Sequence, residues 1–147
     1  MNISDFVDYI QELVDKHGYR VYFGTKSNYN TKRNITNKEI ILEPFDIPIS
    51  NEAYYVDTTI TLWIGLRQEI DTQTTNNDSG DVAKHIDKMI IEANKIYDEI
   101  KNSEKILIKQ SKRFSTAQYY KSDGNATVNN QAFMRLSLPI RIYGFNY

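Results

Sequence analysis

Four acidic residues near the N-terminus have side chains and spacing that could support chemistry. Asp5, Asp8, Glu12 and Asp15 follow one another at intervals of three and four residues, which places them along one strip of a helix. Such carboxylates act as general acids or bases only where burial or a nearby charge shifts the pKa of at least one of them. Because the opposite side of the segment is apolar, we interpret this acidic strip as the solvated face of a helix.

The sequence contains no other pattern that predicts catalysis or metal binding. There is no cysteine, and the two histidines, His17 and His85, have no second histidine at helical spacing, so we interpret both as surface residues and expect no metal site. The segment NNDSGDVAKHID (76–87) resembles a calcium loop, but its glycine and closing acid are out of register. No phosphate-binding glycine loop, GxSxG or SxxK motif occurs. We therefore predict a protein that is not an enzyme and uses no cofactor.

Length and composition predict a single domain covering residues 1–147. The net charge of −1 argues against a dedicated nucleic-acid binder, which is usually basic. No stretch approaches the roughly 20 apolar residues of a membrane span, so we expect no membrane association. The first residues, MNISDFVDYI, mix acidic with apolar side chains, so we expect no signal peptide and synthesis in the cytoplasm.

Two segments have the hydrophobic periodicity of amphipathic helices. The first covers residues 4–17, where Ser4 can cap the N-terminus and Gly18 can end the last turn. The second runs from Ser79 or Asp81 to about Asn102. We expect two ion pairs on the outer face of this second helix, between residues one turn apart, which join Lys88 to Glu92 and Lys95 to Glu99. Its opposite face is an apolar stripe that contains Val82, Ile86, Met89, Ile90, Ala93, Ile96, Tyr97 and Ile100.

Two long segments, 54–68 and 131–145, alternate between apolar and polar residues and predict strands with one buried face. Residues 19–23, 105–110 and 116–121 predict shorter strands. The extended segment 39–50 contains Pro44 and Pro48, which cannot donate to a ladder, so we expect it at a sheet edge or in an approach to the sheet. The two apolar helix stripes and the two apolar strand faces together predict an α+β fold, in which a mainly antiparallel sheet has two helices packed on one face.

The other face of this sheet is unusually aromatic for a solvated surface, which suggests that a partner binds there. Its expected residues are Tyr55, Thr59, Thr61, Trp63, Phe133, Ser137 and Tyr143.

The polar stretch TKSNYNTKRNITNK (25–38) predicts a mobile loop with four positive charges and one tyrosine. Such a loop fits either a nucleic-acid clamp or an arm that docks on another protein. We favour protein docking because the loop has few side chains that could stack on bases. A second mobile loop is expected at 69–80. The docking residues of the first loop would be Lys26, Tyr29, Lys32, Arg33 and Lys38.

Positive charge also gathers in the segment 105–121. A separate acidic strip and basic segment on one small domain are typical of a heterologous interface, which closes into a ring when its rotation permits. Scattered surface charge on a monomer explains the same pattern equally well. In the ring interpretation, Asp5, Asp8, Glu12 and Asp15 would meet Lys105, Lys109, Lys112 and Arg113 of the next subunit.

The order of elements resembles the tail-completion, tail-terminator and neck proteins of tailed bacteriophages. The resemblance is carried by SDFVDYIQELVDKHG, YYVDTTITLWIGLRQ, DVAKHIDKMIIEANKIYDEI and MRLSLPIRIYGF. It implies a virion subunit without catalysis that forms a hexameric or dodecameric ring at the portal-to-tail junction. Portal or adaptor rings and tail-tube proteins would be its partners, and genomic double-stranded DNA would only pass through the lumen. The segments 39–50 and 69–80 are longer than a minimal member needs, so an adaptor or collar ring also fits. The alternative is a stand-alone nucleic-acid-binding domain that uses the basic loop and the aromatic sheet face.

Overall fold

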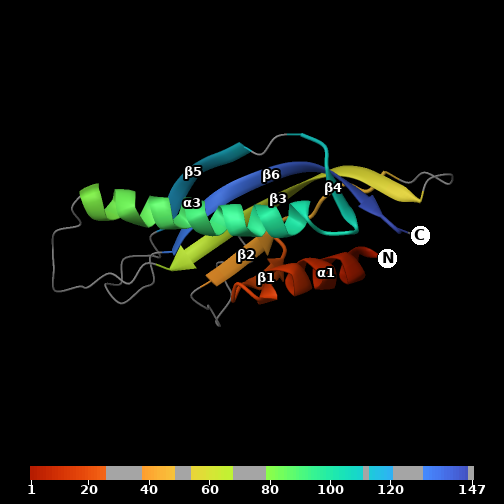
Figure 1. Cartoon of the computed structure of the whole chain (residues 1–147), viewed down its shortest axis with the longest axis horizontal. Helices are drawn as coiled ribbons and strands as arrows, with labels where there is room; N and C mark the ends of the chain where they lie inside the picture. The colour runs from red at the N-terminus through yellow and green to blue at the C-terminus, as the bar shows by residue number, and fades with distance from the viewer. Residues whose placement is uncertain (26–37, 49–53, 68–78, 111–112, 121–130, 146–147) are drawn as a thin grey trace.

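A computed structural model describes residues 1–25, 38–48, 54–67, 79–110, 113–120 and 131–145. Both predicted helices and the two long strands are present, and they lie in the expected order along the chain (Figure 1). The elements are α1 (Ile3–Asp15), β1 (Arg20–Phe23), β2 (Lys38–Leu42), β3 (Tyr55–Arg67), α3 (Ser79–Lys101), β4 (Ile106–Ile108), β5 (Arg113–Tyr120) and β6 (Gln131–Tyr143).

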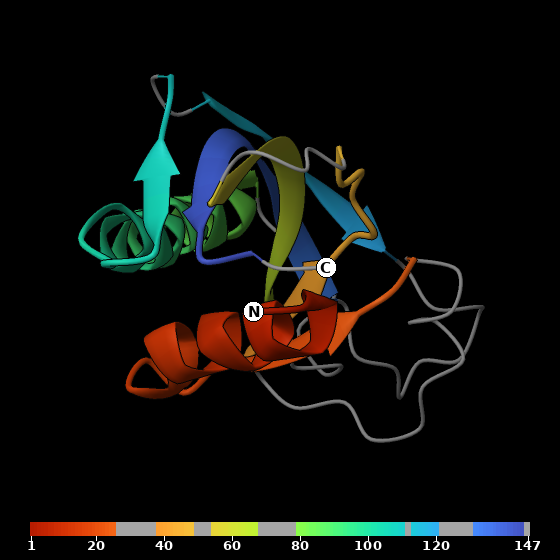
Figure 2. The same cartoon turned by 90° about the vertical axis from the view of Figure 1, so that its right-hand side faces the viewer.

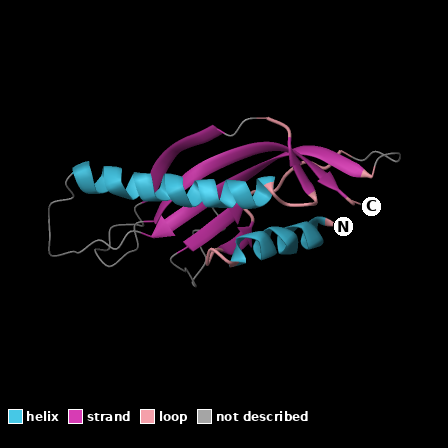
Figure 3. Cartoon of the chain, in the orientation of Figure 1, coloured by secondary structure: helices cyan, strands magenta, loops and turns pink. Residues whose placement is uncertain are grey.

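The strands form one mixed, mostly antiparallel sheet in the order β1-β2-β3-β6-β4, and β5 also pairs with β6. Only the β1–β2 pair is parallel among these described pairs. At the centre, β3 and β6 pair along 13 residues each, from Tyr55 opposite Tyr143 to Arg67 opposite Gln131. Helices and sheet form separate layers in Figure 3. The predicted fold class is thus confirmed.

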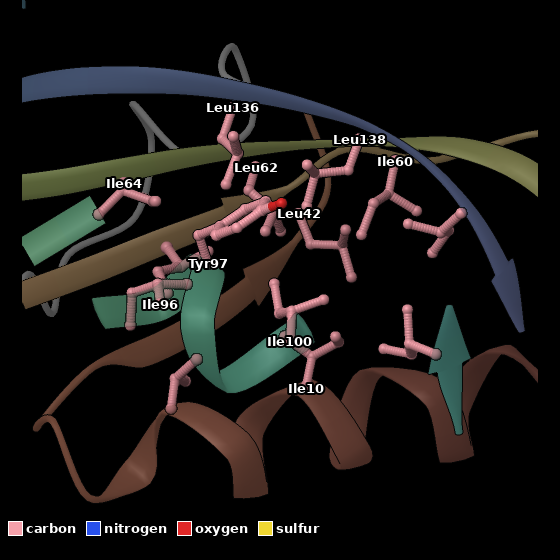
Figure 4. Packing of buried hydrophobic residues seen from close by; sticks show 14 of the residues in the cluster. Ile10, Leu42, Ile60, Leu62, Ile64, Ile96, Tyr97, Ile100, Leu136 and Leu138 are labelled. Carbon is pink, nitrogen blue, oxygen red and sulfur yellow. The ribbon is translucent and has the colours of Figure 1, made fainter. Parts of the chain in front are cut away.

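The main core lies between the helices and one face of the sheet. Phe6, Ile10 and Val14 of α1 meet Ile96 and Ile100 of α3, and all five are completely buried. Apolar even-numbered residues of β3 and β6 complete this core, as the alternation predicts. Figure 4 shows Ile60, Leu62 and Leu138 on the side of the strands that faces the helices. Each such side chain contributes roughly 1.5 to 3 kcal/mol through burial. The fully buried sheet residues include Ile60, Leu62, Leu136, Leu138, Ile140 and Ile142.

Strand β2 lies inside the sheet, between β1 and β3, so an edge position, one of the two alternatives predicted for 39–50, is wrong. Residues 43–48 lie outside the strands, which fits the other alternative, an approach to the sheet. The reason is where the prolines fall. Pro44 and Pro48 come after Leu42, in the irregular segment 43–48, so no proline interrupts the ladder. Because β2 has neighbours on both sides and buried residues on both faces, Ile40, Ile41 and Leu42 are all buried.

The N-terminus of α1 is capped by Asn2 and not by Ser4 as predicted. The Asn2 side chain accepts a hydrogen bond from the Asp5 amide (2.9 Å), and the Asp5 carboxylate accepts one from the Asn2 amide (2.8 Å). This is a capping box, and it gives one member of the acidic strip a local structural role. At the other end Gly18 has φ of 78°, a left-handed conformation that favours glycine, and its amide donates to the Asp15 carbonyl (2.9 Å).

Replacing Leu136 by alanine should remove a completely buried side chain from the central strand pair. We expect the free energy of unfolding, measured by urea denaturation, to fall by about 2 to 5 kcal/mol. The matched control is Leu107→Ala on β4, where the side chain is 48% exposed, and it should cost less than about 0.5 kcal/mol. Equal losses in the two variants would contradict this description of the core.

Candidate functional site

All four residues of the acidic strip are exposed, in agreement with their interpretation as the solvated face of α1. Asp5 belongs to the capping box, and Asp15 accepts a hydrogen bond from the Gln11 side chain (2.8 Å). No described residue forms an ion pair with Asp8 or Glu12. Within the described part of the chain, the negative charge of these two carboxylates is therefore not compensated, and they lack the burial that acid–base catalysis would need.

Two lysines of the predicted basic segment are engaged within the same chain. The ammonium of Lys105 lies 4.8 Å from the centre of the Tyr9 ring of α1, and Lys109 lies 3.0 Å from an Asp57 oxygen. The structure describes no side chain for Arg113, and Lys112 lies outside the described residues. The basic partner that the ring interpretation assigned to the acidic strip is thus partly occupied by internal contacts.

Of the predicted docking residues, only Lys38 is described. Lys26, Tyr29, Lys32 and Arg33 lie outside the described residues, as does the second predicted loop up to residue 78. The assignment of Lys38 to the loop is wrong, because it begins β2. Its ammonium lies 3.5 Å from a Glu92 oxygen and donates to the His17 carbonyl at 3.2 Å. Lys38 therefore joins the sheet to α3 and to the turn that follows α1.

The two ion pairs predicted on the outer face of α3 are not formed, because both glutamates face α1 and the sheet instead. Glu92 is bound by Lys95 (2.9 Å), by Lys38 and by the hydroxyl of Tyr19 (3.1 Å). Glu99 is bound by Lys16 (2.7 Å) and His17 (3.0 Å). Lys95 of α3 thus pairs with Glu92 in place of Glu99, and the remaining partners of the two glutamates come from outside α3.

These contacts form a polar junction where the end of α1 meets α3 and the edge of the sheet. Burial, followed by the nearby Glu92 carboxylate, strongly raises the pKa of the Tyr19 hydroxyl, so it stays a hydrogen-bond donor. Burial alone would raise the pKa of Glu92, but the contacts with Lys95 and Lys38 outweigh it and lower that pKa. Hydrogen bonds from Lys16 and His17 lower the pKa of Glu99. The charged groups of this junction are thus held in place by one another. We call the junction the clasp, because its contacts join the end of α1 to α3 and to the sheet.

The predicted surface position is wrong for His85. This side chain is buried at 7% exposure, and its Nε2 lies 3.2 Å from the Leu66 carbonyl oxygen, which can only accept a hydrogen bond. Burial lowers the pKa of His85. The residue therefore ties α3 to the end of β3.

The far face of the sheet is less open than its aromatic content suggested. Trp63 and Phe133 are 7% and 3% exposed and form a second, smaller core with Ile41 and the half-buried Tyr22. The Trp63 indole donates to a Glu43 oxygen at 2.7 Å. Since these rings are covered, they offer no free stacking surface.

At the other end of this face, a charged and aromatic cluster surrounds Asp57. Arg141 donates hydrogen bonds to both carboxylate oxygens of Asp57, at 2.8 and 3.0 Å, and its guanidinium lies 3.8 Å from the centre of the Tyr55 ring. Hydrogen bonds from Arg141 and then Lys109 hold the pKa of Asp57 well below its usual range. Tyr143 meets Tyr55 edge to face. All four strand residues of the cluster are odd-numbered and so share one face of the sheet, and the strand register brings Asp57 opposite Arg141.

No protein-family model matches the chain, and no curated protein matches it significantly. Across the described ranges, no three histidine or carboxylate side chains are grouped so that they could hold a metal ion. Nor is any helix of the described residues long and apolar enough to cross a membrane.

The lowered pKa values of Glu92 and Glu99 predict an acid-sensitive fold. A carboxylate with a lower pKa in the folded state contributes stability above its ordinary pKa, about 4.3 for glutamate, and this contribution is lost as pH falls through the folded value. The free energy of unfolding should therefore decrease between about pH 5 and pH 3, and Glu99→Gln should make this decrease smaller. Urea denaturation at several pH values measures both. The control Glu104→Gln, at an exposed residue of the following turn, should keep the wild-type profile, and an unchanged profile in Glu99→Gln would count against the clasp.

Proposed function

We propose that this protein is a structural virion subunit that assembles into a ring at the portal-to-tail junction of a tailed bacteriophage. As a tail terminator, neck or collar adaptor, the ring would join head and tail and let the genome pass through its lumen. The observation that carries the proposal is the architecture. The order of elements that resembles this family folds as expected, with α1 and α3 on one face of a sheet built around the long β3–β6 pair.

The surface of α1 supports self-association. Asp8 and Glu12 are exposed and have no ionic partner among the described residues. Like charges held one turn apart repel each other slightly in a monomer. A basic surface on a neighbouring subunit would relieve this repulsion, and such charge complementarity sets the register of an interface.

At β1 and β4, the sheet edges favour contact through the helices over contact by strand addition. At β1, the Gln11 side chain donates to the Tyr19 carbonyl (2.9 Å) and accepts from the Val21 amide (2.8 Å), so these backbone groups are already bonded. The opposite edge of the sheet is shared by β4 and the eight-residue β5, and β4 has only three residues and is flanked by Lys105 and Lys109. Short, lysine-flanked edge strands resist pairing with another chain.

The alternative function, a nucleic-acid-binding domain, has less support. Stacking of bases needs exposed aromatic rings, and the burial of Trp63 and Phe133 removes two from the predicted platform. The remaining pair, Tyr55 and Tyr143, is 37% and 40% exposed, but Arg141 already lies on the Tyr55 ring and is neutralised by Asp57.

The test of the proposed function is the solution mass of the purified protein, measured by light scattering across concentration and salt. We expect a ring mass of about six or twelve subunits at low salt, shifting towards the monomer as salt screens the charges. A labelled DNA duplex is the control for the alternative. A monomer at every concentration and salt, together with salt-sensitive duplex binding, would overturn the ring in favour of that alternative.

Reversing the charge of Asp8 and Glu12 to lysine should weaken subunit association and leave the helical fold intact, because both side chains are exposed. Light scattering measures the mass, and circular dichroism measures the helix content. The matched control reverses two exposed acids outside the strip, Asp46→Lys with Glu104→Lys, which makes the same change in net charge. An oligomer of wild-type mass in the first variant would exclude the acidic strip from the interface.

A further inference from the structure

We propose that the acidic strip of α1 in one subunit docks on the outer face of α3 in the neighbouring subunit, around Lys84, Lys88 and Ile91. This inference rests on the proposed function, because it requires the chain to associate with itself. It replaces the segment 105–121 as the basic side of the interface.

The outer face of α3 has the composition of a contact surface. Lys84, Lys88 and Ile91 are exposed and lie one turn apart along a single stripe. Ile91 is 57% exposed, and Ile90, which the periodicity had placed on the buried stripe, is 38% exposed. Two adjacent isoleucines in water beside two lysines provide an apolar centre with a charged rim, which is how protein interfaces are commonly built.

The glutamates of α3 do not bind the lysines on this face. The expected partner of Lys88 was Glu92, but Glu92 binds Tyr19, Lys38 and Lys95 in the polar junction. Neither Lys84 nor Lys88 forms an ion pair with a described residue. Two exposed acids lie beside the stripe: Asp98 is near the C-terminal end of the helix, and Asp87 comes directly before Lys88 and offsets part of the charge of the lysine pair. At the Lys84–Lys88 end, two lysines and one aspartate still leave one net positive charge.

The two charged pairs match in spacing. Asp8 and Glu12 are four residues apart on α1, and so are Lys84 and Lys88 on α3. At a rise of about 1.5 Å per residue, each pair spans about 6 Å along its helix. Two helices placed side by side can therefore bring both carboxylates to both ammonium groups.

Both helices cover the same side of the sheet, with α3 at one flank and α1 beneath, as Figure 2 shows. Within the described residues no ion pair joins the acidic strip to Lys84 or Lys88. The surfaces are complementary but are not paired inside one subunit, which is the condition for pairing between subunits. A second copy of this chain is therefore the partner that fits.

Reciprocal charge reversal tests the inference. One variant carries Asp8→Lys with Glu12→Lys, and the other carries Lys84→Glu with Lys88→Glu. Each variant alone should associate roughly 100-fold more weakly than wild type, because like charges then meet at the interface. An equimolar mixture should recover the wild-type mass in light scattering, since each α1 then finds an α3 of opposite charge in the other variant.

A further substitution is expected to strengthen association, which a loss of folding could not do. Asp87→Asn removes a negative charge beside the lysines and should strengthen association of the otherwise wild-type chain. Lys101→Glu, in the exposed last turn of α3, serves as the control and should leave association unchanged. Assembly of the wild type combined with full assembly of both charge-reversed variants would overturn the inference and leave the proposed ring standing. Weak association of both variants without recovery on mixing would also overturn it. A wild type that stays monomeric at every concentration and salt would overturn the inference, and salt-sensitive binding of the DNA duplex by that monomer would overturn the proposed ring as well.

Discussion

The antiparallel pairing of β3 with β6 is the interaction on which the rest of the structure depends. The two strands share one register over their full length, so their even-numbered residues, all apolar except Thr58, form a surface on one side of the sheet. A shift by one residue would turn this whole surface to the solvent side. Both helices bury their apolar faces on this surface, and β2, β4 and β5 extend the sheet from its two sides. The charged clasp between the helices and the cluster around Asp57 follow from that arrangement.

Patterns that repeat along the chain could be predicted from the sequence. The periodicity of α1 and α3 and the alternation in β3 and β6 each depend on a dozen or more residues, so a single exception such as Ile90 does not hide them. Gly18 could be predicted as a helix stop because few other residues adopt the left-handed conformation at low cost. The fold class follows from matching apolar stripes to apolar faces, and it needs no knowledge of exact neighbours.

Features that depend on one residue or on a tertiary neighbour could not be predicted in the same way. Asn2 and Ser4 are both good caps, and the reciprocal bonds with Asp5 decide between them. Pro44 suggested an edge strand, but the ladder ends two residues before it. Of the candidate site, the exposure of the acidic strip could be predicted from its position opposite the apolar face. The loss of Glu92 and Glu99 from the outer face of α3 could not, because their partners Tyr19, Lys38, Lys16 and His17 are far away in sequence.

The hydrogen bonds between Gln11 and the edge of β1 also allow α1 to protect the protein against aggregation. The side-chain amide of Gln11 takes the place of a neighbouring strand. It donates a hydrogen bond to the carbonyl of Tyr19 and accepts one from the backbone amide of Val21. Should α1 detach in a partly unfolded state, that edge would be bare, together with the apolar surface that Phe6, Ile10 and Val14 normally cover. An open edge beside exposed apolar side chains is a template for pairing with another chain. The protein concentration at which folding gives way to aggregation therefore depends on how stably α1 packs against the sheet.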